Sequence, residues 1–102
     1  MRIEVVGRNL EVTAAIREHA ASKAAKLSKY FDGIQLITLR VSKEDHQHHG
    51  KFGVELVIDV EKHEDFVSKD VGEDLYAVID AVMQKGSRQV SEFKEKLKKG
   101  KR

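Results

Sequence analysis

Apolar residues recur at helical spacing in two stretches of the chain. In the first, residues 14–31, they lie three or four positions apart, and Thr13 just before them can cap a helix by accepting from its first backbone N–H groups. Gly33 follows this stretch as a stop signal. The second runs from Asp74 onward and carries a longer apolar stripe of Leu75, Ile79, Val82, Gly86, Val90, Phe93 and Leu97. Each stretch predicts an amphipathic helix with one buried face.

Four shorter stretches have the pattern of β-strands. Residues 2–6 are rich in β-branched side chains and end at Gly7, and residues 65–70 form a short run after a turn. Residues 34–43 and 51–61 alternate apolar and polar side chains. The alternation is cleanest in residues 51–61, where the polar positions include Glu55, Asp59 and Glu61. We expect that strand to have one face on a core and one face in water.

The predicted order of elements is β-α-β-β-β-α. Short connections join strands two to four, so they should form an antiparallel meander, and the first strand joins the same sheet by way of the first helix. The predicted fold class is α+β, a two-layer sandwich in which two helices pack on one face of a four-stranded sheet. A length of 102 residues is typical of one domain. We therefore expect a single domain over residues 1–102, with residues 98–102 as a frayed basic tail.

Charge is separated along the sequence. Residues 85–102 contain eight Lys or Arg and two Glu, a net charge of +6. Residues 43–74 contain four Lys and ten acidic residues, a net charge of −6, although the whole chain carries only +2. One domain built from both regions would have a basic face and an acidic face. The basic face predicts an anionic partner.

Basic and amide side chains lie on one flank of each predicted helix, and these are the candidate binding residues. They are Lys23, Lys26 and Lys29 on the first helix and Lys85, Arg88, Gln89, Lys96 and Lys99 on the second. Cationic groups at this spacing can meet successive phosphates of a nucleic acid. The alternative is that these charges only solvate the helix surfaces. Because both helices share the pattern, we favour nucleic-acid binding.

Other chemistry has little support in the sequence. The chain has no cysteine, which excludes a disulfide framework and a thiolate zinc site. It has neither a secretory signal nor an apolar run near the roughly 18 residues of a membrane span, so we expect a cytoplasmic protein. His46, His48 and His49 could hold a metal, but adjacent loop positions favour a solvated turn. Without an acid/base pair or a phosphate-binding glycine loop, we expect no enzyme, no metal, no cofactor and no small-molecule substrate.

Several segments resemble one bacterial family. Residues 12–19 and 25–31 are similar to the first helix of the hibernation-promoting factor and ribosome-associated inhibitor family. Residues 73–80 resemble its Asp-Met-Tyr-x-Ala-Ile-Asp signature, and Lys85, Arg88 and Gln89 match its Lys-Leu-x-Arg-Gln pattern. The resemblance runs over the whole chain, is specific in the two helices and is weak in the strands. The family fold has the same β-α-β-β-β-α order.

The resemblance implies binding to the small ribosomal subunit, in the channel for mRNA and tRNA near the decoding site. There the protein would inhibit translation and preserve inactive ribosomes in stationary phase. The implied contacts to 16S-type ribosomal RNA come from Lys23, Lys26, Lys29, Lys85, Arg88 and Gln89, with Lys96 as a substitute for the family lysine that Glu92 replaces. No DNA or membrane partner is expected. The chain resembles the short form of the family, or a truncated long form, and the sequence does not decide whether it pairs ribosomes or silences single ones.

Three expectations remain open at this point. Gly86 stands where the family usually has Leu, which would loosen a core contact, yet glycine on the apolar stripe also indicates a close approach to a neighbouring element. A free-standing double-stranded RNA-binding module would also pack two helices on an antiparallel sheet. A protein-interaction module could instead modulate a transcription factor through the acidic face.

Overall fold

The computed structural model describes residues 2–44 and 51–100. Its elements are β1 (Arg2–Arg8), α1 (Ala14–Tyr30), β2 (Ile34–Glu44), β3 (Lys51–Val60), β4 (Phe66–Gly72) and α2 (Leu75–Gly100). This is the predicted order, and the predicted boundaries differ from these by two residues at most for the strands. Helix α2 includes residues 98–100 of the segment expected to fray, and residues 101–102 lie outside the described part.

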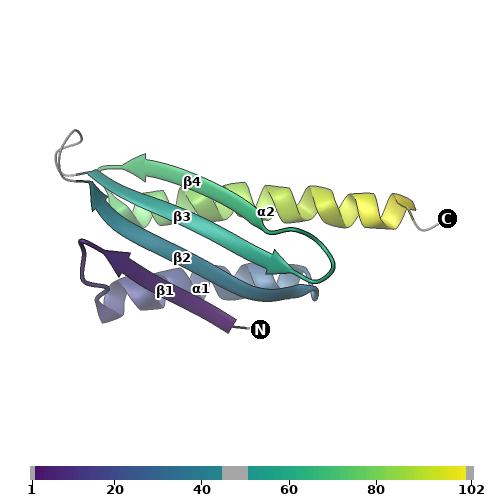
Figure 1. Ribbon diagram of the computed structural model, residues 1–102, viewed down its shortest axis with the longest axis horizontal. Helices are drawn as coiled ribbons and strands as arrows, with labels where there is room; N and C mark the ends of the chain where they lie inside the picture. The colour runs from purple at the N-terminus through teal and green to yellow at the C-terminus, as the bar shows by residue number, and fades with distance from the viewer. Residues whose placement is uncertain (1, 45–50, 101–102) are drawn as a thin grey trace.

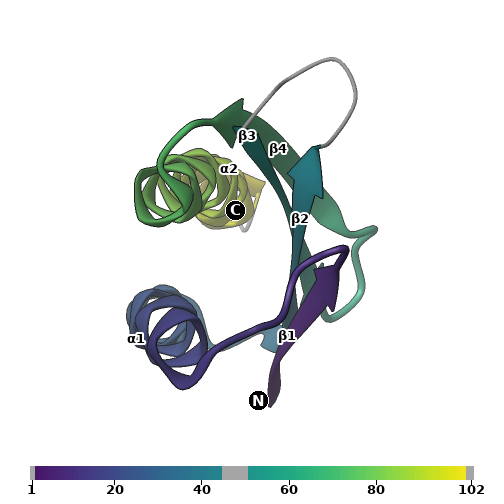
Figure 2. The ribbon, with the colours of Figure 1, turned by 90° about the vertical axis from the view of Figure 1, so that its left-hand side faces the viewer.

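The four strands form one sheet in the order β1-β2-β3-β4. β1 pairs in parallel with β2, and β2, β3 and β4 form the antiparallel meander. Both helices cover the same face of the sheet and run side by side along it (Figures 1 and 2). Helix α1 packs on β1 and β2, whereas α2 packs on β3 and β4. The predicted two-layer α+β sandwich is confirmed.

The core lies between the sheet and the two helices, and both helices begin at capping side chains. Alternate residues of β2 and β3 are fully buried against the apolar stripes of the helices. Thr13 Oγ1 accepts a hydrogen bond from Ile16 N at 3.2 Å, which confirms the predicted cap of α1. Asp74 Oδ1 accepts from Tyr76 N at 3.1 Å and from Ala77 N at 3.4 Å, so it caps α2 in the same way.

Gly86 marks the closest approach of α2 to the sheet. A Cβ atom added there would lie 2.6 Å from Leu56 Cδ2 and 2.9 Å from Ile58 Cδ1, both shorter than real contacts of this kind. The side chains of β3 therefore fill the space that a larger residue would need. The close approach indicated by the glycine is confirmed, and the expectation of a loosened core contact is wrong.

Helix α2 is longer than the sheet that it covers. Its 26 residues span about 39 Å at 1.5 Å each, and its last turns project beyond the strands (Figure 1). Val90 is fully buried, but Leu97 is 41% exposed. The apolar stripe therefore stops contacting the core before its last member, and the prediction that Leu97 lies on a buried face is wrong.

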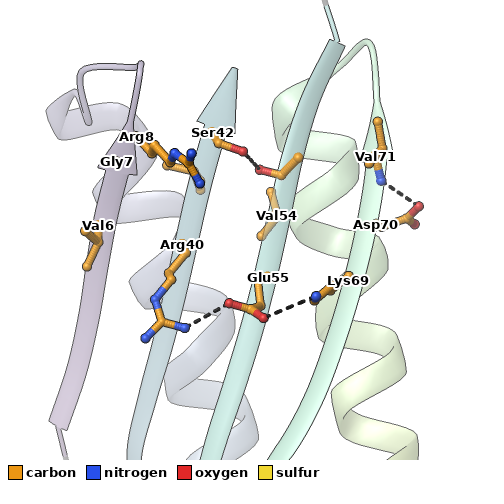
Figure 3. Close-up of a pocket in the computed structure, with 12 residues that line it drawn as sticks. Val6, Gly7, Arg8, Arg40, Ser42, Val54, Glu55, Lys69, Asp70 and Val71 are labelled. Atoms are coloured by element: carbon orange, nitrogen blue, oxygen red, sulfur yellow. Dashed lines mark hydrogen bonds and ion pairs between the residues drawn. The ribbon is translucent and has the colours of Figure 1, made fainter. Parts of the chain in front are cut away.

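The face of the sheet opposite the helices has a more mixed character than the sequence predicted. Glu55 accepts a hydrogen bond from Arg40 at 2.8 Å and lies 3.7 Å from Lys69 Nζ, so cations on the neighbouring strands offset its charge (Figure 3). Val6 and Val71 beside this network are each 49% exposed. The expectation of an acidic face is wrong, because β2 and β4 contribute basic side chains to the same surface.

Candidate nucleic-acid interface

A groove runs between the two helices on the side away from the sheet. It has a volume of about 390 Å³, and its apolar lining is Leu27 of α1 and Met83 of α2, both largely buried. The polar lining comes from both helices and consists of Lys23, Lys26, Tyr30, Asp80, Gln84 and Ser87. An anionic strand lying across the helix layer would meet cations mainly from the α1 side of this groove.

Asp80 connects the two helices and offsets part of that positive charge. Its Oδ1 atom lies 2.8 Å from His19 Nε2 and 3.8 Å from Lys23 Nζ, both on α1. The His19 ring also packs edge-on against Tyr76, with ring centres 5.0 Å apart. Lys23 thus faces the groove, as expected of a candidate, but with a carboxylate beside it. Exposed pairs of this kind contribute little to stability, about 0–1 kcal/mol, so the pairing does not exclude Lys23 from binding a phosphate.

A second set of contacts ties the end of α1 to α2. Tyr30 Oη donates to Ser91 Oγ at 2.9 Å. Lys94 Nζ donates to Tyr30 O at 3.0 Å and lies 4.7 Å from the centre of the Tyr30 ring. A lysine at this position satisfies a carbonyl at the C-terminal end of α1, where the helix dipole also favours a positive charge. Lys94 is therefore mainly a structural contact between the helices.

On the opposite flank of α2, two candidate residues bind the edge strand. Lys85 Nζ donates to Lys69 O at 2.9 Å and lies 3.7 Å from Asp70 Oδ2. Gln89 Nε2 donates to Val67 O at 3.2 Å. Because β4 is an edge strand, these side chains occupy carbonyl groups that could otherwise pair with another strand. They lie over β4, so the structure does not bring them together with the α1 lysines.

The remaining candidates are exposed on the helix layer. Within residues 2–44 and 51–100, they form no hydrogen bond or ion pair with another residue. They are Lys26 and Lys29 on α1 and Arg88, Lys96 and Lys99 on α2. Both helices therefore contribute cations without a partner among the described residues, while the exposed Lys85 and the half-buried Lys23 and Gln89 each make a contact inside the domain.

An aromatic cluster joins the β3–β4 turn to α2, and no sequence pattern predicted it. The His63 ring stacks on Phe66 at 4.8 Å and 19° and lies 4.4 Å from the Phe93 ring. Phe66 and Phe93 are 5.4 Å apart, in an edge-on arrangement. The three residues meet only because β4 lies under α2. Of the three rings, Phe93 is the one that the apolar stripe of the second helix placed on a buried face.

Two expected absences concern metals and membranes. His46, His48 and His49 lie outside the described residues. Among the residues that are described, no group of three or more His, Cys, Asp or Glu is placed to hold a metal ion. In the same part of the chain, neither helix is both long enough and apolar enough to cross a membrane.

The fold and its cationic helix layer define a small α+β domain with one surface suited to an anionic polymer. Residues 3–98 match the family described as Sigma 54 modulation protein / S30EA ribosomal protein. The chain belongs to this family.

Individual relatives agree with this assignment. The chain is 36% identical over 100 residues to the ribosome hibernation promoting factor of Escherichia coli strain K12, a match that covers 96% of this chain and 98% of that protein. The crystal structure of the Thermus thermophilus Protein Y N-terminal domain has a TM-score of 0.78 and 32% identity, covering 91% of this chain and 99% of that one. A ribosomal subunit interface protein from Coxiella burnetii shares the fold, with a TM-score of 0.82, 21% identity and coverage of 93% and 99%. The family resemblance predicted from the two helices is confirmed.

Proposed function

We propose that this protein is a ribosome hibernation factor. It binds the small ribosomal subunit in the channel for mRNA and tRNA near the decoding site, and it inhibits translation there. Membership of the family carries the proposal, because the Escherichia coli relative, matched over nearly its full length, is named a ribosome hibernation promoting factor. The partner is 16S-type ribosomal RNA, the location is the cytoplasm, and the activity needs no catalysis, cofactor or small-molecule substrate.

The helix layer is the surface that we assign to ribosomal RNA. Lys26 and Lys29 on α1 and Arg88 on α2 are exposed and free to meet phosphates. Each phosphate that they neutralise releases condensed counterions, which favours binding and makes it depend on salt. The planar guanidinium of Arg88 can also hold a phosphate through two parallel hydrogen bonds.

Lys23, Lys85 and Gln89, which already have a partner in the domain, belong to the same interface and can add contacts to RNA. Lys85 donates one of its three N–H bonds to a neutral carbonyl, so donors remain for a phosphate. Its ion pair with Asp70 spans 3.7 Å at an exposed site, where water and salt weaken the attraction. Because these side chains are held in place before binding, less conformational entropy is lost when RNA binds.

Inhibition follows from shape and needs no chemical step. The domain is 51 Å long and only 25 Å and 19 Å in its other dimensions. The contacts of Asp80 with His19 and of Lys94 with Tyr30 fix the two helices relative to each other. A rigid, elongated domain held in the channel by charge excludes mRNA and tRNA sterically.

Ribosome co-sedimentation with charge-removal variants tests this assignment. Alanine replaces four of the exposed helix cations, Lys26, Lys29, Arg88 and Lys96. The matched control removes four cations from the opposite face of the sheet, Arg2, Arg8, Arg40 and Lys69, so both variants have the same net charge. The first variant should bind more weakly, and the slope of log affinity against log salt should flatten by about 0.7–0.9 for each phosphate that the variant no longer neutralises. An equal reduction of affinity and slope in the two variants would show that the helix layer is not the binding face.

Two rival functions give different results in related experiments. A free-standing double-stranded RNA binder would bind a plain RNA duplex about as tightly as it binds ribosomes, whereas a hibernation factor should prefer ribosomes. A protein-interaction module acting through the open sheet face would lose activity when Glu55, Asp59 and Glu61 are replaced by lysine. Under our proposal that variant still binds ribosomes. Sucrose-gradient profiles with added protein distinguish ribosome pairing from silencing of single ribosomes.

A further inference from the structure

A small hollow lies where the β3–β4 turn meets the second half of α2. Its volume is about 240 Å³, and it is lined by His63, Phe66, Gln89, Glu92, Phe93 and Lys96. Pockets for drug-sized ligands usually enclose about 300–1,000 Å³, so this one suits a single planar group. Three of its six lining residues have aromatic rings. We propose that this hollow binds one unpaired nucleobase of an RNA strand.

The aromatic rings give the hollow a surface for stacking. His63 is exposed, yet its ring orientation is fixed from two sides. Its Nδ1 donates to Glu64 O at 2.6 Å, and its ring stacks on Phe66. A fixed ring loses little freedom when a base stacks on it. Unstacked bases of single-stranded RNA are typically bound on Phe, Tyr, Trp or His side chains in this way.

The polar groups of the hollow favour a base that carries an amino group. Gln89 Nε2 donates to β4, but Gln89 Oε1 is buried and accepts no hydrogen bond from the described residues. An unpaired buried acceptor is unfavourable by about 1–3 kcal/mol. Because this atom is covered, the exocyclic amine of cytosine, adenine or guanine supplies the missing donor only when the Gln89 side chain shifts toward the hollow. The Glu92 carboxylate is a second acceptor for an amine, and it repels a phosphate. Uracil has no exocyclic amine, and its donor at the same edge, the ring N3–H, lies between two carbonyl oxygens that the Glu92 carboxylate repels.

The position of the hollow is continuous with the proposed RNA-binding surface. Lys85, Gln89, Glu92 and Lys96 recur at steps of four, three and four, so they lie along one flank of α2. Lys96 is on the rim of the hollow, where it can meet the phosphate next to the bound base. The inference rests on the proposed function for the source of the RNA strand, but the stacking chemistry applies to any single-stranded RNA.

Replacing His63 separates base stacking from phosphate contacts. His63→Ala should weaken ribosome binding by about five- to 150-fold, the range found when a stacking side chain is removed. Its salt slope should equal that of the unchanged protein, because every phosphate contact remains in place. His63→Phe keeps a planar ring and should restore most of the affinity. The control Val67→Ala changes a neutral, exposed side chain on the nearby strand and should have no effect. The inference is wrong if His63→Ala binds like the unchanged protein, or if His63→Phe is as weak as His63→Ala.

A second measurement does not depend on ribosomes. Oligocytidylate and oligouridylate of equal length are titrated into the full chain while NMR follows the ring protons of His63 and Phe93. Cytosine and uracil have the same size, but only cytosine has an exocyclic amine. Oligocytidylate should shift both rings and bind more tightly than oligouridylate. Undisturbed rings with both oligonucleotides, or equal binding of the two, would overturn the inference, whereas failure of the proposed function would appear as unchanged protein that does not bind ribosomes at all.

Discussion

Gly86→Ala should destabilise the protein, although alanine is the better helix former. In an exposed helix the change would stabilise by about 1 kcal/mol. Here the new Cβ would lie 2.6 Å from Leu56 Cδ2 and 2.9 Å from Ile58 Cδ1, both in a fully buried layer of β3. Overpacking a core by one methyl group is unfavourable by about 1–3 kcal/mol. The two effects together predict a decrease of about 1 kcal/mol in the free energy of unfolding.

Urea denaturation of a small set of variants measures this effect. Ser87→Ala is the matched control, because Ser87 is exposed on the same helix and its change should raise stability by a few tenths of a kcal/mol. Leu56→Val shortens the side chain that clashes most. In the Gly86→Ala background this second change should cost about 1 kcal/mol less than it costs alone, a coupling typical of residues in contact. If Gly86→Ala stabilises the protein by about 1 kcal/mol, or if the two changes are additive, α2 does not approach β3 as closely as described.

Three further predictions concern the caps and the charged surface. Thr13→Ala removes the acceptor at the start of α1 and should lower the free energy of unfolding by about 1 kcal/mol; an unchanged urea midpoint would contradict the cap. Ser68→Ala removes a buried hydrogen bond to Val82 O at 3.2 Å and should lower the free energy of unfolding by about 0.5–1.5 kcal/mol; an unchanged free energy of unfolding would contradict a stabilising role for this bond. Lys26→Ala should reduce the salt slope of ribosome binding by about 0.7–0.9 and Lys23→Ala by less, because Asp80 offsets the Lys23 charge; the reverse order would contradict the assignment.

Periodicity predicted the elements because each has a single buried face. The alternation in residues 51–61 matches the buried positions of β3, and the stripe of α2 matches its buried positions as far as Val90. The cap at Thr13 was predictable for the same reason, since it depends on residues three positions apart. The prediction for Leu97 failed because periodicity does not show how long the partner layer is. The strands end before the helix does, so the last apolar position has nothing to pack against (Figure 1).

The candidate surface was less predictable, because its character depends on contacts between distant segments. In the sequence, Lys85 and Arg88 are equivalent cations on the candidate flank of α2, and Lys94 lies off that flank. In the fold, Lys94 binds a carbonyl of α1, Lys85 binds a carbonyl of β4, and Arg88 has no partner among the described residues. The pairing of Glu55 with Arg40 and Lys69 likewise depends on strand register. Charge counts along a sequence therefore predicted which helices are basic but not which cations are available.

The internal partners of the α2 lysines explain how one short domain can be both stable and cationic. A lysine that donates to a neutral carbonyl satisfies that carbonyl and keeps its own charge, so Lys94 stabilises the packing of α2 without removing positive potential from the helix layer. Lys85 also donates to a carbonyl, but Asp70, 3.7 Å away, offsets part of its charge. A carboxylate in the same position would stabilise by pairing but would cancel a charge, as Asp80 does for Lys23. Using backbone carbonyls as the main internal partners of lysine allows the basic surface to be rigid before any anion arrives. Under the proposed function, side chains that are already ordered lose little conformational entropy when RNA binds. Less of the electrostatic attraction to RNA is therefore offset by the entropy of ordering long side chains.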